Sequence, residues 1–119
     1  MADITNDKLL IEIENRFDVV IACNLLEHVE NIDNAIKNIL GMVKNGGFLI
    51  VTVPQKLDIH LSPIDNGLRV TAAELVGMFI ENAKCIKAES WVDEHYREPF
   101  ISDPNFPKPE VSGVVLEKV

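Results

Sequence analysis

Three side chains that can act as bases or metal ligands, Glu27, His28 and His60, follow two short apolar segments of the chain. The segments are Phe17–Cys23 and Phe48–Val53, and both are rich in Val and Ile. Such runs are typical of parallel strands buried on both faces. Ligands of parallel sheets bind outside the carboxyl ends of the strands. We therefore expect the three side chains to lie close to a ligand site.

Three interpretations of Glu27, His28 and His60 remain open. In the first they are structural, because polar residues at the ends of elements commonly satisfy backbone groups. In the second, His28 or His60 is a catalytic general base that deprotonates an acceptor hydroxyl or amine, since imidazole titrates near neutral pH. In the third, the three side chains bind a divalent metal that orients a substrate hydroxyl.

An amphipathic helix is predicted between the two strands. Its apolar residues recur at helical spacing from Ile32 to Val43, which gives one continuous stripe. Asn31 can cap its start, and Asn45-Gly46 can adopt the left-handed conformation that ends it. The order strand, helix, strand predicts a parallel βαβ unit.

A long polar loop is expected after the second strand. Pro54 should end that strand, and Gln55–Val70 then form the loop. Within the loop, Asp65 and Arg69 are close enough in sequence to pair across a turn, and we interpret that pair as structural.

One more helix and two more strands are predicted after the loop. Thr71 and Glu74 form a capping box that opens a helix running to about Ile80. The segment Lys84–Val92 alternates in polarity as a half-exposed edge strand does, and Val111–Glu117 is the last predicted strand.

Composition predicts one soluble domain over residues 1–119. The apolar fraction is 47%, and the apolar runs are far shorter than the roughly 20 residues that a membrane helix needs. No leader sequence opens the chain, and Cys23 and Cys85 are expected to be reduced core residues, so we expect a cytoplasmic protein.

The net charge of −8, without a basic stripe, argues against nucleic acid as a partner. A small-molecule substrate fits this charge better.

Two segments carry a resemblance to a known family. The run FDVVIACNLLEHV and the later run KNGGFLIVTVP resemble the second half of a class I S-adenosylmethionine-dependent methyltransferase. The stretch HLSPIDNGLRVTAAELVGMF is similar to a subgroup with a His-x-x-Pro-Ile-Asp loop. The resemblance extends from Asp3 to about Val119. It implies an α/β fold, a truncated Rossmann-like sheet of about four strands, mostly parallel with an antiparallel last strand, and helices on both faces.

The resemblance also implies S-adenosylmethionine as cofactor and assigns residues to it. Asp3 would accept a hydrogen bond from the adenine amino group, and Ile4 would pack on the adenine ring. Cys23, Asn24 and Leu25 would face the sulfonium end of the cofactor.

The sequence departs from the family at two points. The family's glycine-rich cofactor loop is not found in residues 1–119, whose glycines are at positions 41, 46, 47, 67, 77 and 113. One metal-dependent group of O-methyltransferases has a Glu-x-x-Glu-His motif, and here Asn24 stands in place of its first Glu.

Two functions follow as expectations. The first is methyl transfer to a small-molecule or saccharide-type acceptor, if a partner or a longer chain completes the domain. The alternative is a catalytically inactive, methyltransferase-like interaction module. By the family's sheet order, Phe17–Cys23 loses one neighbouring strand here, and Asp18 is the only charge on it. We expect this edge to be covered in a homodimer or by another partner chain.

Overall fold

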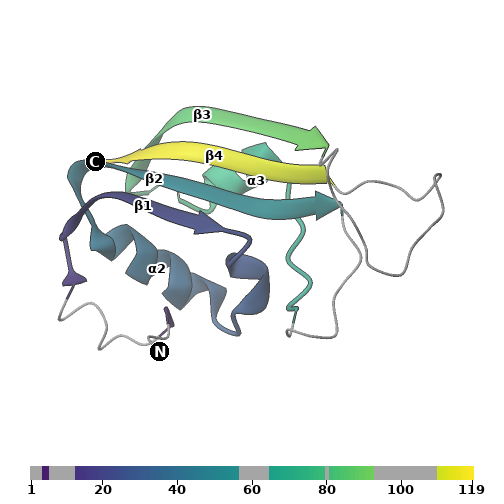
Figure 1. Ribbon diagram of the computed structural model, residues 1–119, viewed down its shortest axis with the longest axis horizontal. Coiled ribbons are helices and arrows are strands. Elements are labelled where there is room, and N and C mark those ends of the chain that lie inside the picture. Colours follow the sequence, from purple (N-terminus) through teal and green to yellow (C-terminus); the bar gives the residue numbers. More distant parts are fainter. Residues whose placement is uncertain (1–3, 6–12, 57–64, 80, 93–109) are drawn as a thin grey trace.

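The computed structural model describes residues 4–5, 13–56, 65–79, 81–92 and 110–119, which form one sheet with two α-helices (Figure 1). In chain order the elements are β1 (Phe17–Cys23), the short 3-10 helix η1 (Leu26–His28), α2 (Ile32–Met42), β2 (Val43–Lys56), α3 (Ala72–Gly77), β3 (Ala83–Val92) and β4 (Glu110–Lys118).

The four strands lie in the order β1-β2-β4-β3. β1 and β2 are parallel, whereas β4 is antiparallel to both of its neighbours. Thus β1, β2 and β3 point in one direction and the last strand points in the other, which confirms the predicted sheet. β1 and β3 are its two edges among the described strands, and the prediction of an edge strand near Lys84–Val92 is confirmed.

The core lies between the helices and one face of the sheet. The registers place Val51 opposite both Ala22 and Val114, and all three are buried on this face. The same cluster contains Ile39 from α2, Leu75 from α3, and Phe79 from the turn that follows α3. Both described helices therefore cover the same face of the sheet. Helices were expected on both faces, and within the described residues they lie on one.

The handedness of the connections explains this one-sided arrangement. The step from β1 through α2 to β2 and the step from β2 through α3 to β3 cross the sheet in the same direction. Parallel crossovers are right-handed, so two steps in one direction place their helices on one face. We call the opposite face of the sheet the open face.

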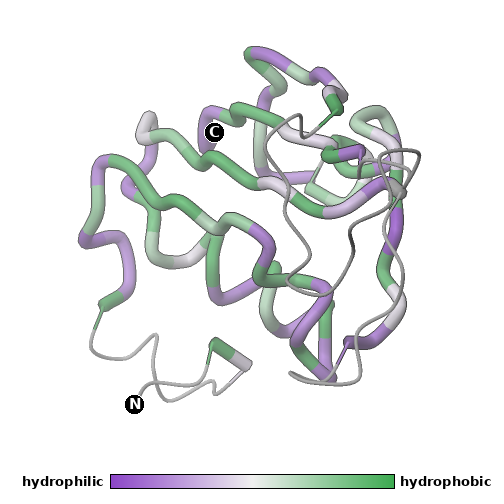
Figure 2. Tube along the Cα trace, turned by 45° about the vertical axis from the view of Figure 1, so that its right-hand side comes forward, coloured by the Kyte–Doolittle hydropathy of each residue, from purple (hydrophilic) through white to green (hydrophobic). Residues whose placement is uncertain are grey.

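The open face carries exposed apolar side chains. Val19 is 49% exposed, Ile21 64% and Phe48 40%. Trp91 lies on the same face, 42% exposed, against Gly113, where a Cβ atom would come within 2.6 Å of the ring. Hydrophobic residues recur along the strands of the sheet (Figure 2).

Local signals at the helix ends are confirmed. The Asn31 side chain accepts a hydrogen bond from the Asn34 amide at 3.1 Å, and so caps α2. At the start of α3, the Thr71 and Glu74 side chains each accept a bond from the other's backbone amide at 3.2 Å. The capping box predicted from the sequence is therefore formed.

Two sequence predictions are wrong. Pro54 does not end the strand, because β2 continues to Lys56. The last β1 pair is Cys23 with Thr52, so Pro54 has a neighbour on one side only, where a missing N–H is tolerated. Cys23 and Cys85 are exposed thiols rather than core residues, since both lie on edge strands.

Two glycines shape the turn at the irregular start of β2, between its Phe17–Val43 and Val19–Phe48 pairs with β1. Gly46 has a φ of 81°, in the left-handed region that was predicted for it, but it does not end the helix, because α2 already ends at Met42. Gly47 is packed so closely that a Cβ atom would lie 2.7 Å from the Asp18 backbone oxygen and 2.8 Å from a Val43 methyl group. The close approach lets β1 and β2 resume their pairing at Val19 and Phe48.

None of the described helices is long and apolar enough to cross a membrane.

The packing around Gly47 gives a stability prediction. Gly47→Ala should lower the free energy of unfolding by about 1–3 kcal/mol, because the new methyl group meets backbone that cannot move aside. Gly77→Ala is the matched control, since a Cβ atom there meets nothing within 4 Å. It should leave stability unchanged or raise it by up to about 1 kcal/mol. Urea unfolding of both variants measures the difference, and equal stabilities would contradict this account of the turn.

Candidate functional site

The candidate site begins where β1 ends beside β2. Cys23 pairs with Thr52, and Asn24 then turns the chain away from the sheet with a φ of 50°. Asn is one of the few residues that tolerate this left-handed conformation. The Asn24 amide donates to the Thr52 carbonyl at 2.9 Å and to its Oγ1 at 3.2 Å. The turn is thereby fixed at the carboxyl edge of the sheet.

The loop after Asn24 is anchored by buried side chains. Leu25 packs half-buried against the core, and Leu26 is fully buried. The His28 amide donates to the Leu25 carbonyl at 2.9 Å, which closes the turn of η1. The His28 side chain is about a quarter exposed, at 26%. It therefore stays accessible at the edge where ligands of parallel sheets bind.

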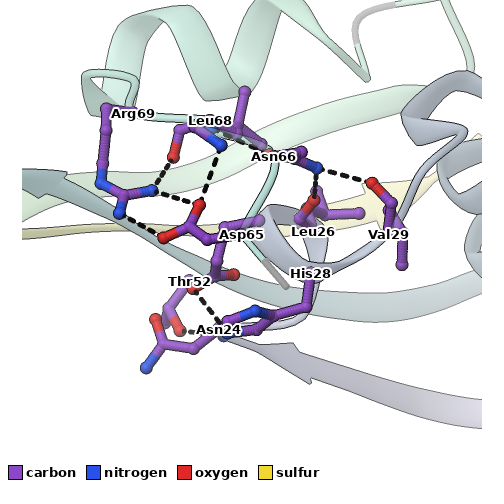
Figure 3. Close-up of polar contacts among 11 residues, drawn as sticks. Asn24, Leu26, His28, Val29, Thr52, Asp65, Asn66, Leu68 and Arg69 are labelled. Carbon is purple, nitrogen blue, oxygen red and sulfur yellow. Dashed lines mark hydrogen bonds and ion pairs between the residues drawn. The ribbon is translucent and has the colours of Figure 1, made fainter. Parts of the chain in front are cut away.

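Asn66 clasps this loop to the chain that follows β2 (Figure 3). Its side-chain amide donates to the carbonyls of Leu26 and Val29, each at 2.7 Å. Its backbone amide donates to the Glu27 carbonyl at 2.7 Å. We call these three bonds the Asn66 clasp, and they join the two loops at the carboxyl edge of the sheet.

The segment that carries Asn66 is itself held by an ion pair. Arg69 Nη2 donates to Asp65 Oδ2 at 2.6 Å, and Nη1 donates to Oδ1 at 3.1 Å, so the contact is bidentate (Figure 3). Asp65 also accepts from the Gly67 amide at 2.8 Å. The Asp65 side chain is fully buried and that of Arg69 is 15% exposed. The structural pair predicted from the sequence is confirmed.

Glu27 is a buried carboxyl beneath this edge. Its side chain is 4% exposed, and Oε2 lies 4.0 Å from His28 Nε2. Oε1 has no hydrogen-bond partner among the described residues. Burial raises the pKa of Glu27, although its backbone hydrogen bond and the nearby His28 and Arg69 oppose the rise. The fold therefore holds this carboxyl where its charged form is disfavoured.

The predicted cofactor residues fall into two groups. Cys23, Asn24 and Leu25 lie together at the end of β1, with Cys23 and Asn24 exposed. Ile4 packs half-buried against the core, and its carbonyl accepts a bond from Asn38 of α2 at 2.6 Å. Asp3 lies outside the described residues, and so does His60, which was predicted as a base or metal ligand and not as a cofactor residue. The cofactor roles of these positions stay predictions.

The metal hypothesis depends on His60. Within the described part of the chain, no three His, Cys, Asp or Glu residues lie close enough to hold a metal ion. Glu27 and His28 do lie side by side, so a complete site would need a further ligand from beyond them.

A groove of about 590 Å³ lies away from the candidate site. Its walls come from α2, the end of α3 and the carboxyl end of the chain, and include Ile36, Met78 and Val119. Glu14, which precedes β1, and Lys118, at the end of the antiparallel β4, also line it. The groove thus opens at the amino ends of the parallel strands, opposite the edge that carries Asn24.

Sequence reasoning missed the two residues that shape the site most. Thr52 accepts a hydrogen bond from the Asn24 amide, and the Asn66 side chain donates to carbonyls of the loop around η1. The sequence Asp65-Asn66-Gly67 is a turn signal, but it does not say which distant carbonyls the Asn66 side chain reaches.

Comparisons with known proteins bear on this geometry. A profile of the methyltransferase domain family matches residues 4–51, which contain β1, η1, α2 and the first part of β2. No curated protein matches the chain in sequence. Among solved structures, trans-methyltransferase CalH in complex with S-adenosylhomocysteine has a TM-score of 0.70 and 18% identity, and the match covers 99% of this chain and 35% of CalH.

Two further structures match over almost the whole chain. N-methyltransferase NodS from Bradyrhizobium japonicum, in complex with S-adenosylhomocysteine, has a TM-score of 0.58 at 14% identity, over 98% of this chain and 52% of NodS. The [4+2]-cyclase SpnF has a TM-score of 0.64 at 19% identity, over 98% of this chain and 55% of SpnF. This chain has the fold of part of a class I methyltransferase. The resemblance inferred from the LEHV and GGFLIVTVP segments is confirmed, and this methyltransferase-like chain spans between 35% and 55% of those three structures.

The Asn66 clasp leads to a prediction about stability and hydrogen exchange at the site. Asn66→Ala should lower the free energy of unfolding by about 1–3 kcal/mol, because the carbonyls of Leu26 and Val29 lose their donor. Amide hydrogen exchange at Leu26–His28 should rise more than exchange in α2. Asn66→Asp keeps the side-chain oxygen that accepts from the Leu68 amide but removes the N–H donor. It should therefore raise exchange at Leu26–His28 in the same way. Unchanged exchange in η1 for both variants would refute the clasp as its anchor.

The raised pKa of Glu27 predicts a pH dependence. A carboxyl whose pKa is higher in the folded state binds its proton more readily there than in the unfolded chain. Its contribution to stability is therefore greatest below the unfolded pKa and declines as pH rises through the folded pKa. Glu27→Gln removes that decline. The stability of this variant relative to the native chain should therefore increase from acidic to neutral pH.

Denaturant unfolding at several pH values measures this difference. The exposed Glu30→Gln is the matched control, and it should show the same pH dependence as the native chain. A Glu27→Gln advantage that stays constant or shrinks with rising pH would overturn the prediction.

Proposed function

We propose that this chain is part of an S-adenosylmethionine-dependent methyltransferase. It would transfer a methyl group to a small-molecule or saccharide-type acceptor once a partner or a longer chain completes the domain. The observation that carries the proposal is the methyltransferase-domain match over residues 4–51, because that segment contains the fixed turn at Asn24 and the loop with His28.

Residues at the end of β1 fit one part of the cofactor. Asn24 presents an exposed amide side chain, and Leu25 beside it is apolar and half-buried. A polar group next to an apolar one suits the sulfonium end of S-adenosylmethionine, which supplies an activated methyl group when bound. Enzymes of this kind work largely by aligning donor and acceptor. The Asn66 clasp supports that role, since it fixes the loop that follows Asn24.

His28 is the described residue best placed to serve as a base. It lies at the carboxyl edge, is partly exposed, and has the buried Glu27 carboxyl 4.0 Å away. From this position the imidazole could accept a proton from an acceptor hydroxyl or amine. His60 remains a second candidate for the same role.

We also propose that the protein acts in the cytoplasm. Both cysteines are free and exposed, and exposed thiols persist as thiols in a reducing compartment.

A second candidate function is a catalytically inactive, methyltransferase-like binding module. The open face and the edge of β1 favour it, because exposed apolar sheet surface of this kind commonly marks an interface. The comparison with SpnF, a [4+2]-cyclase, adds that the fold is not tied to one reaction.

Titration with S-adenosylhomocysteine separates the two functions. In NMR spectra of the isotope-labelled chain, millimolar S-adenosylhomocysteine should shift the amides of Cys23, Asn24 and Leu25 and leave those around Lys118 unchanged. Leu25→Lys should weaken binding by about tenfold or more, because it replaces apolar contact surface with a charge. Val119→Lys, at a residue that is 80% exposed and directly follows β4, is the control. A folded chain that shows no shift at these amides would favour the binding module.

A further inference from the structure

The dipeptide Asn-Gly occurs at two positions in the sequence, Asn45-Gly46 and Asn66-Gly67. In this dipeptide the backbone nitrogen of the glycine can attack the side-chain amide carbon of the asparagine. Glycine favours the attack because it has no Cβ to hinder the approach and restricts its backbone least. Since the two positions share the same reactive pair, a difference in their chemistry must come from the fold.

Asn45 lies in an open part of the fold. Residues 44–47 of β2 have no partner in the register with β1, and the register with β4 begins only at Phe48. Asn45 and Gly46 are both exposed, and the Asn45 side chain makes no hydrogen bond with the described residues. A Cβ atom at Gly46 would meet nothing within 4 Å. The side chain and the attacking nitrogen therefore have room to approach each other.

The Asn66 side chain, in contrast, is held at both of its polar atoms. Its amide nitrogen donates to the carbonyls of Leu26 and Val29, each at 2.7 Å, and Oδ1 accepts from the Leu68 amide at 2.8 Å. The side chain must give up these bonds before its amide carbon can turn toward the next backbone nitrogen. Lost hydrogen bonds of this kind raise the barrier to ring closure.

The attacking nitrogen at the second position is held as well. The Gly67 amide donates to Asp65 Oδ1 at 2.8 Å, and Arg69 fixes that carboxylate through its bidentate contact. The nitrogen must lose its proton to react, and a negative charge beside it disfavours that loss. The Asn66 clasp and the Asp65–Arg69 pair therefore protect the same dipeptide from both sides.

We propose that Asn45 is a site of spontaneous deamidation, from which the fold protects Asn66. Solvent removes the proton of the Gly46 nitrogen, which forms a bond to Asn45 Cγ while the bond from Cγ to the side-chain nitrogen breaks. That nitrogen takes up a proton and leaves as ammonia, so a five-membered succinimide ring remains. Water then opens the ring at either carbonyl and gives aspartate or isoaspartate. The reaction needs only water, and it is independent of methyl transfer.

The isoaspartate product should weaken the start of β2. Isoaspartate continues the chain through Cβ and Cγ, so it adds one atom to the backbone of the turn. The next packed residue, Gly47, leaves no space for a shift, because even a Cβ atom there would lie 2.7 Å from the Asp18 backbone oxygen. The longer turn is therefore expected to disturb the pairing of β1 with β2 that resumes at Val19 and Phe48.

Peptide mapping of the aged protein tests the modification site. The folded chain is incubated at mildly alkaline pH, digested and analysed by mass spectrometry, with isoaspartate separated from aspartate by its elution. Asn45 should convert faster than Asn66 by about tenfold or more, because the bonds that hold Asn66 and Gly67 must break first. Equal conversion of the two residues, or faster conversion of Asn66, would overturn the proposal.

The same incubation in concentrated urea separates the effect of the fold from that of the sequence. In the unfolded chain the two residues should convert at similar rates, since both hydrogen-bonded arrangements are lost. Folding should therefore slow Asn66 and leave Asn45 nearly unchanged. A folded chain in which Asn45 is slowed as much as Asn66 would show that the turn protects it and would refute the site.

Asn45→Gln provides the matched variant for the effect on stability. A glutamine would have to close a six-membered ring, which forms far more slowly, and its exposed position should leave folding unchanged. During ageing the native chain should lose part of its urea midpoint in step with its isoaspartate content, whereas Asn45→Gln should keep its midpoint. Equal losses in both proteins would show that the modification does not reach the β1–β2 pairing.

Discussion

The pairing of β2 with both of its neighbours is the constraint on which the rest of the structure depends. Val51 lies opposite Ala22 on one side and opposite Val114 on the other, and these pairs set which side chains meet the helices. A slip of one residue would turn the buried set of β2 to the open face. The same register brings Thr52 to the end of β1, so it also positions the turn at Asn24.

The parts of the fold that local signals determine could be predicted from the sequence. Helical spacing from Ile32, the left-handed Gly46 and the capping box at Thr71 depend on residues within a few positions of each other. The continuation of β2 through Pro54 could not be predicted. It depends on where β1 ends, which is a property of a strand some 30 residues earlier in the chain.

The candidate site likewise has parts that could be predicted from the sequence and parts that could not. Asp65 and Arg69 are four positions apart in the chain, and the sequence was sufficient to suggest their pairing. The burial of Glu27 and the reach of the Asn66 side chain depend on how the loops after β1 and β2 pack together. A carboxylate beside a histidine in the sequence resembles an exposed acid–base pair, whereas packing in the fold places most of Glu27 out of solvent. Sequence spacing carries no information on that packing.

The Asn66 clasp also has a consequence for the order in which the molecule is made. Asn66 lies 40 residues beyond Leu26, whose carbonyl it binds. On the ribosome the loop around η1 therefore emerges long before its anchor does, and α2 and β2 are synthesised in the interval. The βαβ unit can assemble from contacts already present, whereas the ligand edge acquires its shape only when the second loop arrives. Synthesis thus makes the βαβ unit first, the Asn66 anchor next, and the central strand β4 last.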